Sequence, residues 1–138
     1  MDRIKKPVIA VVDDDSRVRE SLASLIESAG FTARVFPLAK DFLREDLLTG
    51  ASCLITDVRM PEMDGLELQR CVRLERPELP VIFITAHHDD EVVRCAFAQG
   101  AAFFIREPFD AEELLRAVRM TLSEASGGPR PITLQEEG

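Results

Sequence analysis

The stretch VIAVVDDD, from Val8 to Asp15, carries the pattern on which the expected fold depends. Its first five residues are apolar and mostly β-branched, which is typical of a short parallel strand buried on both faces of a sheet. Three aspartates follow, then Ser16 as a candidate N-cap, and then apolar residues at helical spacing: Val18, Leu22, Leu25, Ile26 and Ala29. We therefore predict a strand over 8–12 and a helix that ends at Gly30.

The same succession of apolar strand and amphipathic helix recurs four more times. Strands are predicted over 31–36, where alternation favours an edge strand, and over 52–56, 81–85 and 102–106. The helix faces that follow them contain Ala39, Phe42, Leu43 and Leu47; Leu68, Cys71 and Val72; Val92, Val93, Ala96 and Phe97; and Ala111, Leu114, Leu115, Val118 and Leu122. This order predicts an α/β, doubly wound, five-stranded parallel sheet with helices on both faces.

Composition narrows the classes of function. A chain of 138 residues suits one domain, and a net charge of −8 argues against binding to nucleic acid or to an anionic membrane. The N-terminus lacks the apolar core of a signal peptide, and no apolar run is long enough to span a membrane. Cys53, Cys71 and Cys95 form no CxxC pair, so we expect buried free thiols in a cytoplasmic protein.

Polar side chains follow three of the predicted strands. Asp13 and Asp14 end the first strand, Asp57 the third, and Thr85 the fourth. Because ligands of such folds bind beyond the carboxyl ends of the strands, these side chains should meet there, and crowded carboxylates favour Mg²⁺. The alternative is that acidic residues only cap the next helices. We favour capping for Asp15, but a turn follows Asp57 and makes capping weak there.

Four segments give the chain a specific resemblance. They are VVDDD at 11–15, TDVRMPEMDGLEL from Thr56, ITA at 84–86 and GAAFFIREPF from Gly100. In order and spacing they resemble the receiver domain of two-component response regulators over about residues 7–123. The resemblance implies a flavodoxin-like or CheY-like (βα)5 fold with strand order 2-1-3-4-5. It places a receiver domain at 1–123 and a flexible tail or linker at 124–138.

The resemblance also implies a phosphoacceptor site. Asp57 would take a phosphoryl group from a phosphohistidine on a sensor histidine kinase. Asp14 and Asp57 would bind Mg²⁺ directly, the backbone carbonyl of Arg59 would be the third protein ligand, and Asp13 would act mostly through water. Such a domain is a signalling module that catalyses at most its own phosphorylation and dephosphorylation.

Signal transmission is implied for two further residues. Thr85 would move toward the phosphoryl oxygen and Phe104 would repack inward, while the face of the fourth helix, fifth strand and fifth helix would serve for signalling and homodimer formation. The alternatives are that Thr85 is a strand-end residue and that Phe104 is ordinary core. His87 and His88, which we expect to open the helix after the fourth strand, read as exposed loop residues rather than metal ligands.

One position departs from the family pattern. A lysine normally precedes the proline at this place, whose peptide bond is usually cis, and here the residue is Glu107, before Pro108. Like charges about 4 Å apart repel by about 4 kcal/mol at an effective dielectric of 20, so a carboxylate there opposes a phosphoryl dianion. Three outcomes are compatible with this residue. Glu107 points away from the site, or an arginine supplies the missing cation, for which Arg59 is a better candidate than Arg106. In the third, the domain is not phosphorylated in the usual way.

Two other functions remain open from the sequence. One is a pseudo-receiver, a protein-interaction module that works without phosphorylation, which Glu107 favours and the intact aspartates oppose. The other is a Mg²⁺-dependent phosphohydrolase of the haloacid dehalogenase type, since Asp13-Asp14-Asp15 contains a D-x-D pattern. The short chain lacks a cap domain and a downstream pair of acids, which argues against this second function.

Overall fold

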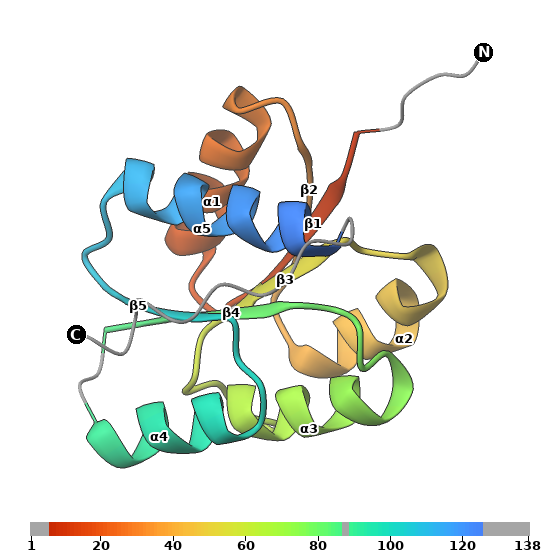
Figure 1. Ribbon diagram of the computed structural model, residues 1–138, viewed down its shortest axis with the longest axis vertical. Helices are drawn as coiled ribbons and strands as arrows, with labels where there is room; N and C mark the ends of the chain where they lie inside the picture. The colour runs from red at the N-terminus through yellow and green to blue at the C-terminus, as the bar shows by residue number, and fades with distance from the viewer. Residues whose placement is uncertain (1–5, 87–88, 126–138) are drawn as a thin grey trace.

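A computed structural model of the chain describes residues 6–86 and 89–125, in which five strands alternate with five helices (Figure 1). The strands form one parallel sheet in the order β2-β1-β3-β4-β5, as predicted. The elements are β1 (Val8–Val12), α1 (Ser16–Ser28), β2 (Thr32–Phe36), α2 (Ala39–Thr49), β3 (Cys53–Thr56), α3 (Gly65–Glu75), β4 (Val81–Thr85), α4 (Asp90–Ala98), β5 (Phe103–Arg106) and α5 (Ala111–Ala125).

The helices form a layer on each face of the sheet. Figure 1 shows α1 and α5 on one face and α2, α3 and α4 on the other. Successive strand residues point to opposite faces, so Ile9 and Val11 pack with α1 and α5, whereas Ala10 and Val12 pack with α2 and α3. This two-sided burial explains why β1 is apolar throughout instead of alternating.

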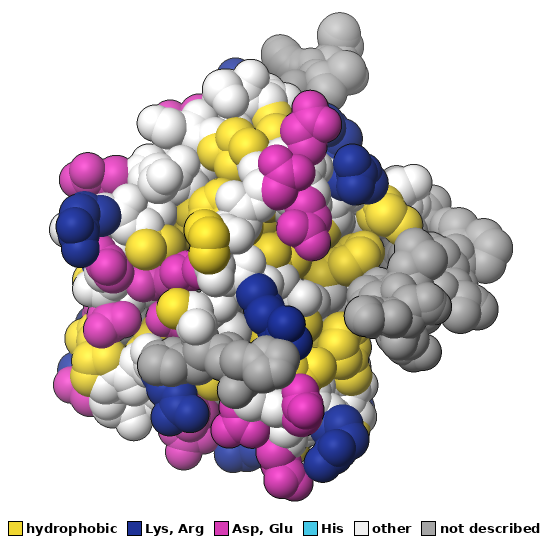
Figure 2. Space-filling view, turned by 90° about the vertical axis from the view of Figure 1, so that its left-hand side faces the viewer, with side chains coloured by type: hydrophobic (Ala, Val, Ile, Leu, Met, Phe, Trp, Pro, Cys, Tyr) yellow, Lys and Arg dark blue, Asp and Glu magenta, His cyan; other side chains and the backbone are white. Residues whose placement is uncertain are grey.

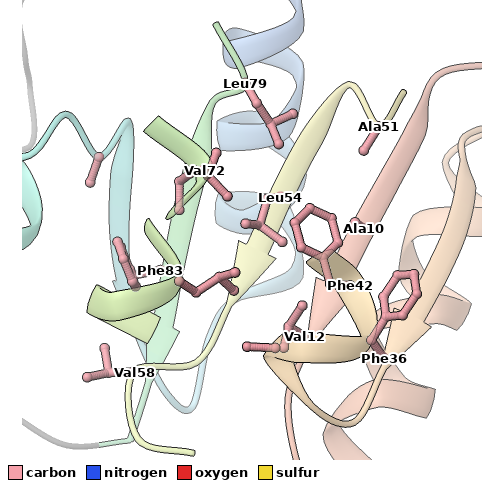
Figure 3. Close-up of a cluster of buried hydrophobic side chains, with 14 of the residues drawn as sticks. Ala10, Val12, Phe36, Phe42, Ala51, Leu54, Val58, Val72, Leu79 and Phe83 are labelled. Carbon is pink, nitrogen blue, oxygen red and sulfur yellow. The ribbon is translucent and has the colours of Figure 1, made fainter. Parts of the chain in front are cut away.

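A compact aromatic and aliphatic core fills the second of these interfaces. Phe36 and Phe42 meet edge to face with ring centroids 5.7 Å apart, and Figure 3 shows them beside Ala10, Val12 and Leu54. Burial of one such large side chain contributes about 1.5–3 kcal/mol. This core therefore holds the helices against the sheet, and the loops at the strand ends extend from this packed unit.

The register of the central strands sets the level of the first and third strand ends. Val12 lies opposite Thr56 on β3 and opposite Phe36 on β2. The next residues leave the sheet together, since Asp57 N donates to Val12 O at 3.1 Å and Asp13 N donates to Phe36 O at 3.1 Å. Asp13 and Asp57 thus start their loops side by side at the point where the strand order reverses.

The starts of α1 and α4 bear on the sequence predictions. The N-cap of α1 is Asp15, whose carboxylate accepts from Arg17 N at 2.9 Å, so its capping role is confirmed and Ser16 is the first helical residue instead of the cap. Helix α4 begins at Asp90 behind the N-cap Asp89. The prediction that His87 and His88 open this helix concerns two residues that lie outside the described part of the chain.

Other boundaries agree closely with the predictions. β1 and β4 have the predicted bounds, and β2, β3 and β5 each begin one residue later. β2 is an edge strand, as its alternation predicted. The side chain of Leu47 lies outside the described residues. Within residues 6–86 and 89–125, no helix is long and apolar enough to cross a membrane.

The three cysteines are free thiols in different environments. Cys53 is buried under α5, and burial raises the pKa of its thiol to about 12. Cys71 is partly buried, and Cys95 is exposed on α4, next to the buried Ala96. The expectation of burial is therefore wrong for Cys95, because this residue lies off the apolar stripe of its helix.

Helices α3 and α4 are joined by side-chain hydrogen bonds. Gln69 is 1% exposed and donates from Nε2 to Ala96 O at 3.0 Å, while Arg73 donates from Nη1 to Gln99 O at 2.8 Å. The two donors lie four residues apart, on one face of α3. Both bonds end on carbonyls near the C-terminal end of α4, and Ala96 O accepts in addition from the backbone nitrogens of Gln99 and Ala101.

Candidate functional site

The carboxyl ends of β1 and β3 bring Asp13, Asp14 and Asp57 into one group. Each contributes a carboxylate oxygen, and these oxygens lie within 4.8 Å of one another. This is the meeting of strand ends that the topology predicts at a switch point. Figure 2 looks onto this end of the molecule and shows acidic side chains around the left and middle of the face.

Local hydrogen bonds hold these side chains in place. Asp13 is 2% exposed, and its Oδ1 accepts from Asp15 N at 2.9 Å, which closes a tight turn over Asp14. Asp57 is half-buried, and its Oδ1 accepts from Val58 N at 2.7 Å. Asp14 is exposed at the outer side of the group. The site therefore runs from a buried carboxylate to one that faces solvent.

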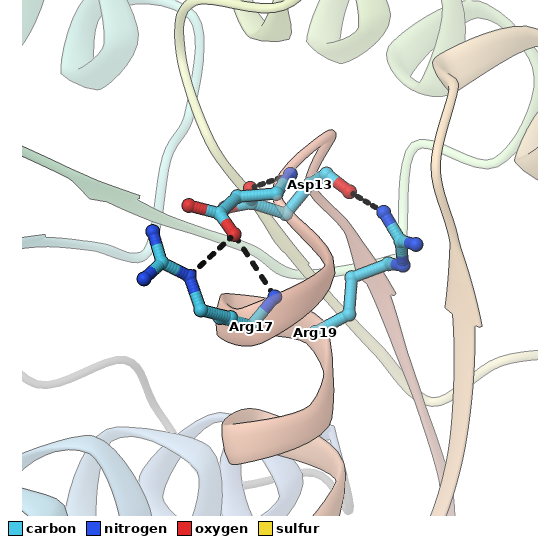
Figure 4. A network of polar contacts seen from close by, with 4 residues as sticks. Asp13, Arg17 and Arg19 are labelled. Atoms are coloured by element: carbon cyan, nitrogen blue, oxygen red, sulfur yellow. Dashed lines mark hydrogen bonds and ion pairs between the residues drawn. The ribbon is translucent and has the colours of Figure 1, made fainter.

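Two arginines of α1 approach this turn in different ways (Figure 4). Arg19 is partly buried and donates from Nη1 to the backbone oxygen of Asp13 at 2.9 Å. Arg17 has a side chain that is 89% exposed, with its Nε 3.8 Å from Asp15 Oδ1. Only the first of these contacts joins a side chain to the backbone between the predicted ligands.

The acidic group is electrostatically unfavourable without a cation. Burial, followed by repulsion from Asp57, Asp14 and Asp15, raises the pKa of Asp13 to about 6, against the lowering effect of the hydrogen bond from Asp15 N. A divalent cation would offset this repulsion. Three carboxylates with one face open to water are the hard oxygen donors that suit Mg²⁺, which retains several waters. The residues present therefore fit the ion that the sequence suggested.

Thr85 and Phe104 lie on the β4 and β5 side of the site. Thr85 is 1% exposed, and its backbone oxygen accepts from Glu107 N at 2.7 Å. The Phe104 ring stacks on Phe83 with centroids 5.7 Å apart and is 6.5 Å from the Phe97 ring of α4. Phe104 thus already packs inward against the core in this structure, in contact with α4.

Glu107 lies outside the carboxylate group. The Glu107–Pro108 bond is cis, as the resemblance implied. Among the described residues, the acidic oxygens that gather within 4.8 Å are those of Asp13, Asp14 and Asp57 alone. Glu107 lines a groove of about 470 Å³ together with Asp15, Arg17, Val18, Ser21, Pro108 and Phe109. Glu107 therefore lies at the surface between the start of α1 and the β5–α5 loop.

Of the two arginines considered as replacement cations, Arg59 forms an ion pair with another residue and Arg106 lines a groove on another surface. Arg59 Nη2 is 4.0 Å from Asp89 Oδ2, which links the loop after β3 to the N-cap of α4. Arg106 is exposed and lines a groove of about 600 Å³ along β5, between α4 and α5. The apolar residues of this groove are Val93, Phe97, Phe103, Phe104, Ile105, Ala117 and Met120.

Sequence reasoning missed two residues that shape the site. One is Arg19, because a bond from a side chain to a backbone oxygen six residues away leaves no pattern. The other is Gly65, whose added Cβ would overlap the backbone oxygen of Asp57 and lie 3.1 Å from Phe83 Cε1. The Asp64-Gly65 pair in the turn was the available signal, since glycine permits close backbone approach.

Strand order, helix layers and the acidic group at the switch point define an α/β protein of the CheY-like type. The model of the response regulator receiver domain family matches residues 9–119, so the chain belongs to that family. It is accordingly a receiver domain of two-component systems.

The chain is similar to response regulator protein TodT of Pseudomonas putida, with 41% identity over 133 residues, 94% of this chain and 59% of TodT. It is also similar to DNA-binding transcriptional regulator NtrC of Escherichia coli K12, with 33% identity over 98% of this chain and 29% of NtrC. A CheY-like receiver domain protein from Methanospirillum hungatei superposes with a TM-score of 0.85 at 24% identity, over 88% of this chain and 98% of that one, and supports the fold alone. The chain thus spans less than two thirds of the length of these two curated relatives.

Proposed function

We propose that this receiver domain accepts a phosphoryl group on Asp57 from the phosphohistidine of a sensor kinase, with Mg²⁺ held by Asp13, Asp14 and Asp57. The observation that carries the proposal is the gathering of these three carboxylates within 4.8 Å at the carboxyl ends of β1 and β3. Asp14 and Asp57 would be direct ligands with the backbone carbonyl of Arg59, and Asp13 would act mostly through water.

In the proposed step, an Asp57 carboxylate oxygen forms a bond to phosphorus as the bond from phosphorus to the kinase imidazole nitrogen breaks. The nitrogen keeps the bonding electron pair. Bound Mg²⁺ would offset the negative charge on the phosphoryl oxygens, which is the main requirement of phosphoryl transfer. The backbone bond from Val58 N to Asp57 Oδ1 holds one oxygen of this carboxylate in place.

The change would then pass to α4. Thr85, buried at the end of β4, is the hydroxyl proposed to meet the phosphoryl oxygen. Phe104 stands between β4 and α4, in contact with Phe83 and Phe97, so a shift at the end of β4 alters the packing of α4. In this scheme, the charge added at Asp57 changes how α4 packs, and α4 would have one arrangement before phosphorylation and another after it.

Glu107 modifies this scheme without removing it. The carboxylate lies outside the acidic group, which supports phosphate acceptance despite the missing lysine ammonium. The lost cation should weaken stabilisation of the phosphorylated state. A pseudo-receiver that ignores phosphate is less well supported, because an interaction module has no need to hold three repelling carboxylates together.

Partners follow from the family and from one surface. We propose a sensor histidine kinase as phosphoryl donor, and a second copy of the chain on the groove between α4, β5 and α5. That groove combines an apolar floor with Arg106, Glu113 and Arg116 at its sides, a set that permits opposite charges to meet across a twofold axis. No nucleic acid or membrane partner is proposed for this domain.

The test is chemical phosphorylation with acetyl phosphate or phosphoramidate and Mg²⁺, read by intact mass. We expect the wild type to gain one phosphoryl group and Asp57→Asn to gain none. Glu107→Lys should gain one phosphoryl group as well, because residue 107 lies outside the group of three carboxylates. A wild type that stays unmodified, under conditions that label an ordinary receiver, would refute the proposal.

A further inference from the structure

The turn that carries Asp13 and Asp14 has to hold like charges close together. Asp13 is buried, Asp14 is exposed, and the Asp57 carboxylate lies within 4.8 Å of both. Mutual repulsion favours any movement of the turn that separates them. The bond from Asp15 N to Asp13 Oδ1 closes the turn, but it does not fix the peptide unit between Asp13 and Asp14.

Arg19 acts on that peptide unit. Its guanidinium donates from Nη1 to the Asp13 backbone oxygen at 2.9 Å, and the side chain is partly buried along α1 (Figure 4). A carbonyl held in this way fixes the orientation of its peptide plane, because the peptide bond is planar. The nitrogen of that plane belongs to Asp14, so the plane sets the direction in which the Asp14 side chain leaves the turn.

Helix preferences do not explain an arginine at this position. The first turn of α1 contains no acidic residue and two basic ones, Arg17 and Arg19. A cation near a helix N-terminus is disfavoured by the helix dipole. The bond to Asp13 O offsets this disadvantage for Arg19, whereas Arg17 reaches only an exposed carboxylate across 3.8 Å, a contact of small value.

We propose that Arg19 is a positioning residue of the metal site, which holds the Asp13–Asp14 peptide so that both carboxylates face Asp57. The inference rests on the proposed function, since it concerns the affinity for Mg²⁺. Arg19 touches neither the ion nor the phosphoryl group in this scheme. Its loss should therefore lower the affinity for Mg²⁺ while the chemistry at saturating Mg²⁺ remains nearly unchanged.

The experiment compares Arg19→Met, Arg19→Lys and the matched control Arg17→Met, two residues away on the same helix turn. The Kd for Mg²⁺ is measured by calorimetry on the full chain, together with the Mg²⁺ dependence of phosphorylation by acetyl phosphate. From the loss of one hydrogen bond we expect a rise in Kd of about threefold to tenfold for Arg19→Met. Arg19→Lys should recover part of it, and Arg17→Met should match the wild type.

The outcomes separate the two proposals. If wild type binds no Mg²⁺, the proposed function fails. If wild type binds Mg²⁺ and both Arg19 variants bind it equally well, Arg19 does not position the site and the inference is refuted. A Kd that rises equally in Arg17→Met also refutes it, since the effect would then not be specific to the bond from Arg19; loss of positive charge alone should lower the Kd for a cation. If Arg19→Met does not fold, as judged by circular dichroism, Arg19→Lys decides by the same measurement.

Discussion

Replacing Asp13 by Asn should stabilise the metal-free domain at pH 8 and at the same time weaken its response to Mg²⁺. The side chain is 2% exposed and close to two other carboxylates, and its pKa is raised to about 6. Asparagine keeps the size of the side chain and an oxygen that can accept from Asp15 N. The substitution therefore removes the buried charge and leaves the turn.

The size of the effect follows from the pKa. A rise from 3.8 in the unfolded chain to about 6 in the fold corresponds to about 3 kcal/mol, at about 1.4 kcal/mol for each tenfold change in the equilibrium. In the metal-free wild type, ionised Asp13 opposes folding by at most this amount. Asp13→Asn should be more stable than wild type by up to about 3 kcal/mol at pH 8.

The pH dependence has a definite sign. Because the folded-state pKa lies above the unfolded value, the folded protein binds the extra proton between pH 3.8 and about 6. The stability associated with this group is fully present below pH 3.8 and is lost as the pH rises through 6. The difference between Asp13→Asn and wild type should therefore shrink as the pH falls below 6 and be small near pH 4.

Urea unfolding in EDTA, followed by circular dichroism at several pH values, measures the difference. Asp14→Asn is the matched control, because Asp14 belongs to the same turn and is exposed, so its neutralisation should stabilise less. Addition of Mg²⁺ should raise the stability of wild type by mass action and raise that of Asp13→Asn by less. An Asp13→Asn domain that is less stable than wild type at pH 8 in EDTA would show that the carboxylates are not in conflict.

Two further predictions concern packing around the site and are measured by urea unfolding. Gly65→Ala should destabilise the domain by about 1–3 kcal/mol, because the new Cβ would overlap the backbone oxygen of Asp57. This cost exceeds the helix preference of alanine over glycine, which is about 1 kcal/mol. A stabilised variant would contradict the prediction. Gln69→Met should change the free energy of unfolding by less than about 1 kcal/mol. The variant loses the bond to Ala96 O, but it also loses Gln69 Oε1, a buried oxygen that lacks a hydrogen-bond partner within the described residues. A loss of stability above about 3 kcal/mol would contradict this balance.

The fold could be predicted because its determinants are local. Val8–Val12 and Val81–Thr85 are short, mostly apolar runs that each follow a proline, and both appear as strands with the predicted bounds. The helix N-caps were harder to predict from the sequence. Asp15 and Ser16 both qualify as N-caps by residue type, and the choice depends on which oxygen meets the free N–H of Arg17.

The candidate site was predictable in its location and less so in its details. Strand ends place Asp13 and Asp57 together whatever their side chains do, so the acidic group follows from topology. Glu107 lines a groove together with the start of α1, a segment distant in sequence, and sequence patterns do not show which segments form such a groove. The ion pair of Arg59 with Asp89 likewise joins two loops whose approach only the folded chain defines.

The two bonds from α3 to the end of α4 have a mechanical consequence. Gln69 and Arg73 anchor the C-terminal carbonyls of α4, while its first turn is linked through Asp89 to Arg59, two residues after Asp57. The Gln69 bond is buried, and an exposed ion pair is easier to break than a buried hydrogen bond between helices. Any tilt of α4 should therefore pivot about its C-terminal end, so that the largest displacement falls at the end linked to the loop after Asp57 and decreases along the helix axis.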